Sequence, residues 1–182
     1  PWPRRILAVA AALAGIMVLI WFSTVKSQPR LIQTAENKQT VTLSDGTAIT
    51  LHPHSQIEVP KGYGKSGRTV RMTVGEAEFI VVHHEDLPFT VELGSSRIED
   101  IGTRFIIRKE KGAVHLAVSE GRVAFTRTTD GKGHEIGAGS AISLDTRTGT
   151  FGPRLPAESS RATESMLVFS STPLTEVVAA LH

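Results

Sequence analysis

Hydrophobic and polar residues alternate along most of the chain between residues 40 and 145. Thr40–Leu51 shows the pattern, because two alternating runs flank the polar tripeptide Ser44-Asp45-Gly46. A period of two predicts β-strands with one buried face. The pattern recurs, with glycine or charged residues between the runs, at Val70–Val74, Ala77–Val81, Phe89–Leu93, Phe105–Ile107, Val114–Val118, Val123–Phe125 and Ile142–Leu144.

These runs predict about ten short strands, and no helical period competes with them before residue 165. Strands that are half apolar and half polar form sheets with one face in water. We therefore predict a mainly β fold, a two-layer or solenoid-like antiparallel β domain. The spacing between the runs is irregular, so no strict sequence repeat is expected.

The first two strands also predict the turn between them. If they pair as a hairpin, Val41 and Leu43 share a face with Ile49 and Leu51 only when the loop has an odd number of residues. A two-residue Asp-Gly turn would place Ile49 opposite Thr42. We therefore expect a three-residue turn with Gly46 at positive φ.

An uncharged segment, Ile6–Val25, precedes the β region between Arg5 and Lys26. As a helix it is about 30 Å long, which matches the hydrocarbon core of a bilayer. Trp2 and Trp21 lie near its ends, where indole rings settle at membrane interfaces. We predict a single transmembrane helix; a buried core helix and a cleaved signal peptide are the alternatives. Because residue 1 is proline, a further segment is expected upstream, across the membrane.

Composition changes again after residue 146, which gives the expected domain organisation. Residues 1–27 hold the transmembrane helix and its flanks, and 28–146 form the β domain. Residues 147–165 are rich in glycine, proline and serine and are expected to be a linker. In 166–182 a short strand precedes a helix capped by Thr172-Pro173, the expected start of an incomplete α+β domain.

Charge and cysteine content narrow the classes of function. Without Arg4, Arg5 and Lys26, the 20 basic residues fall to 17, against 18 acidic residues. No basic stripe with interleaved aromatic residues occurs, so nucleic acid is not an expected partner. The chain has no cysteine, and therefore neither a disulfide framework nor a thiol site.

Five short segments together resemble the FecR-type domain of transmembrane sigma-factor regulators, over about residues 31–145. They are Val41–Thr47 (V-T-L-S-D-G-T), Gly75–Phe79 (G-E-A-E-F), Pro88–Val91 (P-F-T-V), Gly102–Phe105 (G-T-R-F) and Glu120–Val123 (E-G-R-V). Leu167–Leu174 is similar to the start of that family's C-terminal part, which is related to the secretin/TonB short N-terminal domain.

The resemblance implies a single-span regulator in the inner membrane of a Gram-negative bacterium, with residues 28–182 in the periplasm. It implies two partners: an extracytoplasmic-function sigma factor, bound by the upstream segment, and the signalling domain of a TonB-dependent outer-membrane receptor, often one for iron-siderophores. An intramembrane protease is a third implied partner, acting between Ile6 and Phe22, where small residues permit close helix contact. No cofactor is implied.

Other chemistry has weaker support in the sequence. His52 and His54 could share a strand face, whereas the adjacent His83 and His84 would point to opposite faces. No third ligand is placed near either pair, so no metal site is expected, and no motif of an enzyme active site is present. A membrane-anchored β module that binds glycan or peptidoglycan is the rival function.

One bond is a candidate for self-cleavage. Some members of the resembled family split at the Gly-Thr bond that Gly102 and Thr103 match. The Thr103 hydroxyl could attack the Gly102 carbonyl carbon and form an ester that water hydrolyses. The alternative is that Gly102 marks a β-bulge that directs Phe105 into the core.

Overall fold

The computed structural model describes residues 28–100 and 102–158 and, before them, only Gly15 and Met17, which are helical. Within these residues no helix has the length and hydrophobicity needed to cross a membrane. The rest of the predicted span, Ile6–Val25, lies outside the described residues and stays a prediction. The strand and helix predicted in 166–182 also lie outside them.

The described part is almost entirely β-structure, which confirms the predicted class. Its 14 strands form one continuous hydrogen-bonded sheet. They are β1 (Arg30–Gln33), β2 (Gln39–Thr42), β3 (Ala48–Leu51), β4 (Gln56–Val59), β5 (Arg68–Ile80), β6 (Phe89–Glu92), β7 (Ser96–Asp100), β8 (Arg104–Glu110), β9 (Ala113–Glu120), β10 (Arg122–Arg127), β11 (Gly133–Gly137), β12 (Ser140–Asp145), β13 (Thr150–Phe151) and β14 (Leu155–Pro156).

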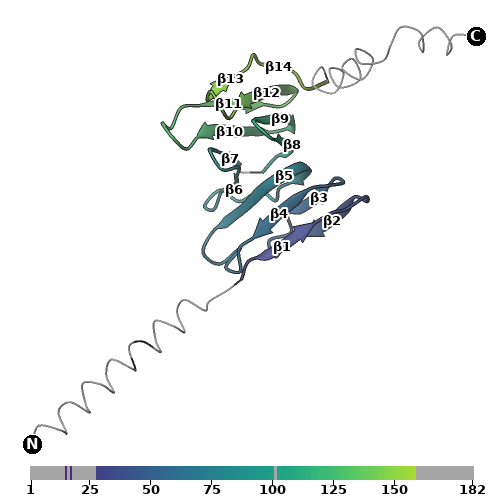
Figure 1. Cartoon of the computed structure of the whole chain (residues 1–182), viewed down its shortest axis with the longest axis vertical. Coiled ribbons are helices and arrows are strands. Elements are labelled where there is room, and N and C mark those ends of the chain that lie inside the picture. The colour runs from purple at the N-terminus through teal and green to yellow at the C-terminus, as the bar shows by residue number, and fades with distance from the viewer. Residues whose placement is uncertain (1–14, 16, 18–27, 101, 159–182) are drawn as a thin grey trace, which may run out of the picture.

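The sheet curls around the long strand β5, which belongs to both of its halves. One half has the order β11-β10-β7-β6-β5-β4-β1, and the other has the order β2-β3-β5-β8-β9-β12-β13, with β14 also paired to β12. Figure 1 shows β5 between β1–β4 on one side and β8–β14 on the other. The predicted β domain is therefore a single curled sheet in the described residues.

Aromatic side chains fill the space between the two halves. Phe79 of β5 stacks on Phe105 of β8 with ring centroids 5.0 Å apart, and it meets Phe89 of β6 at 5.9 Å. At the far end Phe125 of β10 packs edge-on against Phe151 of β13 at 5.3 Å. These contacts join the halves, because β6 and β10 belong to one half, and β8 and β13 to the other.

The predicted turn between β2 and β3 is confirmed. Val41 lies opposite Ile49, and the Leu43 amide donates to the Thr47 carbonyl at 2.9 Å, so Ser44-Asp45-Gly46 forms a three-residue loop. Gly46 has φ of 88°. The requirement that the apolar residues of both strands share one face was therefore enough to predict the register of this hairpin.

The structure differs from the prediction along β5. The sequence places a break at Gly75-Glu76, but β5 is continuous from Arg68 to Ile80 and passes there from one half of the sheet to the other. The buried positions shift phase at this crossing. As a result Val74, which the alternation places in the core, is 44% exposed. A sheet of purely antiparallel pairs is also wrong, because β5 and β6 are parallel.

The chain beyond residue 146 continues the sheet in its described part. The sequence assigns 147–165 to a linker, yet β13 and β14 both lie there and pair with opposite ends of β12. Glycine and proline suit these segments because each strand is only two residues long and lies at the edge of the sheet.

Candidate functional site

A buried arginine, Arg68, organises one end of the domain. Arg68 opens β5, and its residue is only 2% exposed. Its Nε donates to Asp45 Oδ2 at 2.7 Å, and its terminal nitrogens donate to the carbonyls of Leu87 at 3.0 Å and Val82 at 2.7 Å. Arg68 therefore ties the turn after β2 to the segment that follows β5.

Asp45 also accepts hydrogen bonds from the loop that joins β4 to β5 and from its own turn. Tyr63 Oη donates to Asp45 Oδ2 at 2.8 Å, and the Thr47 amide donates to Oδ1 at 3.0 Å. Burial would raise the pKa of Asp45, but hydrogen bonds from Tyr63, Thr47 and Arg68 outweigh it and hold the pKa below its ordinary value. Burial and the Asp45 carboxylate raise the pKa of Tyr63, so its hydroxyl stays protonated and donates. Every group in the cluster is thus committed to a partner.

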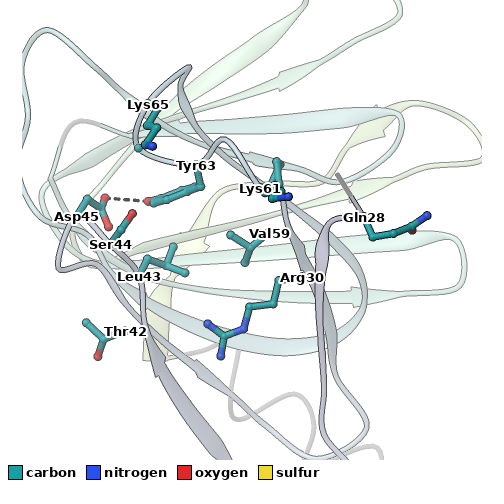
Figure 2. A pocket seen from close by; sticks show the side chains of 12 residues that line it. Gln28, Arg30, Thr42, Leu43, Ser44, Asp45, Val59, Lys61, Tyr63 and Lys65 are labelled. Atoms are coloured by element: carbon teal, nitrogen blue, oxygen red, sulfur yellow. Dashed lines mark hydrogen bonds between the residues drawn. The ribbon is translucent and has the colours of Figure 1, made fainter. Parts of the chain in front are cut away.

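Asp45 and Tyr63 of this cluster line an open pocket of about 570 Å³. Three segments line it: the chain up to Arg30, the turn at 42–45, and the loop at 59–65 that joins β4 to β5. Figure 2 shows Arg30, Lys61 and Lys65 around Leu43, Val59 and Tyr63, with the Asp45–Tyr63 hydrogen bond at one side. The Asp45–Arg68 network fixes the turn and the loop relative to each other.

The second candidate site is the corner where the chain crosses from β7 to β8. The Gly102 amide donates to Asp100 Oδ1 at 3.1 Å, and the Thr103 carbonyl accepts from the Val81 amide at 3.0 Å. Asp100 is 1% exposed and Thr103 is 7% exposed. Within the described residues, Asp100 Oδ2 and Thr103 Oγ1 are both buried without a hydrogen-bond partner. A buried hydroxyl with no partner is unusual in a folded protein.

Close contacts enclose the Gly102–Thr103 bond. Gly102 has φ of 156°, and a Cβ there would lie 2.7 Å from the Cα of His83. A Cβ on Gly121 would lie 2.3 Å from Thr103 Cγ2 and 3.3 Å from the Gly102 oxygen. The bulge expected at Gly102 lies elsewhere. The register of β8 and β9 shifts between Arg104 and Phe105, and Gly102 stands in the crossing before β8.

The four histidines singled out by the sequence do not converge in the structure. His52 Nδ1 lies 3.2 Å from Glu76 Oε1, whereas His54 faces Glu36 at 4.0 Å from a turn with φ of 56°. The shared strand face suggested for His52 and His54 is therefore wrong, because the chain turns between them. His83 and His84 are exposed in the segment between β5 and β6. The described residues contain no group of three or more potential metal ligands.

Comparison with known proteins identifies the domain. A family model described as FecR protein matches residues 30–124, which is more than half of the chain. The chain belongs to the FecR family. The resemblance carried by the five short motifs is thereby confirmed.

Two crystal structures share the FecR fold, each of a candidate anti-sigma factor from Parabacteroides distasonis. The one at 2.50 Å resolution is 21% identical, with a TM-score of 0.63 over 71% of this chain and 60% of the other. The one at 1.65 Å is 22% identical, with a TM-score of 0.62 over 70% and 59%. This chain thus spans about 60% of their length, and the likeness concerns the fold. No curated protein matches the chain.

The FecR motifs occupy structural positions in this domain. Asp45 anchors the first motif to Arg68, Gly75-Glu76 marks the crossing of β5, and Gly121 packs on the Gly102–Thr103 bond. The sequence analysis did not place Arg68 or Asp100 in the core, although a signal was present. Arg68 is an even number of residues away from Val70 and Met72, and Asp100 is two residues after Ile98. Side chains at such spacings share one face of a strand, so Arg68 and Asp100 both point inward.

Proposed function

We propose that this chain is the membrane-anchored, periplasmic part of a sigma-factor regulator. The observation that carries the proposal is the FecR match at residues 30–124, which begins directly after the uncharged segment Ile6–Val25. A sensor domain beside a single span suits a protein that passes a signal across a membrane. The fold shared with two candidate anti-sigma factors supports the same class of function.

The proposal assigns three partners. An extracytoplasmic-function sigma factor binds a segment upstream of Pro1. The FecR domain binds the signalling domain of a TonB-dependent receptor, and the resulting signal controls iron-siderophore uptake. An intramembrane protease cuts between Ile6 and Phe22. The glycan-binding alternative is less well supported, because Tyr63, Phe79, Phe89, Phe105 and Phe125 are all buried in the described part of the chain. Glycan platforms rely on exposed aromatic rings.

Capture of the natural protein tests the proposal. A chromosomal affinity tag at the C-terminus, with cross-linking in iron-limited cells, is expected to enrich an extracytoplasmic-function sigma factor. A matched version that begins at Pro1 should reach the membrane but capture no sigma factor. Equal capture by both versions, or enrichment by neither, would contradict the proposed role.

A second activity, self-cleavage at Gly102–Thr103, is favoured by the unpartnered Thr103 hydroxyl. In this step Thr103 Oγ1 bonds to the Gly102 carbonyl carbon, the C–N bond breaks, and the hydroxyl proton passes to the freed Thr103 amine. Water then hydrolyses the ester to a Gly102 carboxylate and restores the hydroxyl. The hydrogen bonds at the Gly102 amide and the Thr103 carbonyl hold the reacting unit in place.

Substitution of Thr103 tests this activity. The wild-type chain is expected to purify as two fragments that stay associated, because β8 pairs with β5 across the cut. Thr103→Ala should give one intact chain, whereas Thr103→Ser keeps a hydroxyl and should still be cut. An intact wild-type chain under the same conditions would make the corner purely structural.

A further inference from the structure

The pocket beside Asp45 combines an apolar floor with a basic rim. Leu43, Val59, Pro60 and Tyr63 supply its apolar lining, and Arg30, Lys61 and Lys65 lie around it. Figure 2 shows these basic side chains coming from β1 and from the loop between β4 and β5. Such a combination suits a ligand with an anionic group next to hydrocarbon.

The basic rim carries charge that the domain does not neutralise. Within residues 28–100 and 102–158, none of Arg30, Lys61 and Lys65 forms an ion pair with a carboxylate. Asp45 is the one acidic residue among the described residues that line the pocket, and it is already paired with Arg68 at 2.7 Å. By contrast, Arg71 on the outer face of β5 pairs with both Glu58 and Glu92. The pocket therefore presents an uncompensated positive charge.

The pocket also lies next to the predicted membrane surface. Gln28 lines it, and the predicted span ends at Val25, so at most about 10 Å of extended chain separates them. Charges at that distance from a bilayer are only partly screened at physiological salt.

We infer that this pocket binds the phosphate headgroup of an anionic phospholipid in the membrane that the predicted span crosses. The three cations contact the phosphate, and the apolar floor receives the glycerol and the first carbons of the acyl chains. Binding of this kind fixes one orientation of the FecR domain on the bilayer. The inference rests on the single-span topology of the proposed function.

Tyr63 provides a direct probe, because it is the only tyrosine in the chain and it lines the pocket. The full chain, labelled with ¹³C at tyrosine, is inserted into bilayer discs of phosphatidylcholine with increasing phosphatidylglycerol. The single ring signal is expected to shift with the phosphatidylglycerol fraction. In R30Q/K61Q/K65Q the apparent affinity should fall roughly 100-fold, since each basic group near an anionic surface contributes about fivefold.

A control variant with the same loss of charge separates the pocket from general attraction. K111Q/R122Q/K132Q removes three cations that do not line the pocket, and its titration should match the wild type within about twofold. A shift that persists in R30Q/K61Q/K65Q, or no shift in wild type, would overturn the inference. If inorganic phosphate caused an equal shift in pure phosphatidylcholine discs, the ligand would be a free anion and not a lipid headgroup. Failure of the chain to enter the discs would instead overturn the proposed topology and, with it, the inference.

Discussion

Replacing Arg68 with methionine is expected to lower the free energy of unfolding by about 3–5 kcal/mol, the range for breaking a buried ion pair. The variant keeps the volume of the side chain but leaves Asp45 without its cation and the carbonyls of Val82 and Leu87 without a donor. It also removes the guanidinium that lies 5.8 Å from the centre of the Phe89 ring. Urea unfolding of the full chain in detergent, followed by circular dichroism of the strands, measures the loss.

Arg71 provides the matched control on the same strand. Its side chain is 56% exposed and pairs with Glu58 and Glu92 on the outer face, so Arg71→Met should cost no more than about 1 kcal/mol. Arg68→Lys keeps the charge but not the fork of donors and should fall between the two. Similar small losses for Arg68→Met and Arg71→Met would show that the buried network does not hold this end of the domain together.

Substitution of Gly75 by alanine is expected to cost about 3 kcal/mol or more. Gly75 has φ of 96° at the crossing of β5, and a Cβ there would lie 2.3 Å from Ser55 Oγ and 2.4 Å from Ser55 Cα. The strain of a left-handed residue adds about 1–2 kcal/mol, and forced repacking adds about 1–3 kcal/mol. The same urea experiment measures the change.

Gly139 separates these two contributions. It also has positive φ, 75°, but a Cβ there would meet no atom within 4 Å. Gly139→Ala should therefore show the conformational cost alone, about 1–2 kcal/mol. If Gly75→Ala cost no more than Gly139→Ala, the close approach of Ser55 to the crossing would have no energetic role.

The sequence predicted those parts of the fold that local hydrophobic period determines. The alternation of apolar and polar residues located every strand with two or more buried hydrophobic residues except β4. The requirement that the apolar residues of β2 and β3 share one face predicted the turn at Ser44-Asp45-Gly46. It missed β7 and β11 because each has one buried hydrophobic residue, Ile98 and Ile136. The passage of β5 between the two halves of the sheet depends on pairing with strands far away in sequence, which local period does not encode.

The candidate sites were predicted less completely for the same reason. The Gly102–Thr103 bond was identified from a resemblance, but its contacts come from two other segments, the one with Val81 and His83 and the one with Gly121. The pocket likewise joins three segments whose individual sequences are ordinary turns and edges. The alternation along β5 could have placed Arg68 in the core, and Asp45 belongs to one of the FecR motifs. Their contact could not be predicted, because it depends on the tertiary fold.

Topology is the most direct test of the central claim that the FecR domain lies across a membrane from the sigma factor. Alkaline phosphatase, which needs an oxidising compartment to form its disulfides, is fused after Glu158, beyond β14, or in place of the residues upstream of Pro1. Phosphatase activity is expected only for the fusion after Glu158. Activity only for the fusion before Pro1, or equal activity for both, would contradict it.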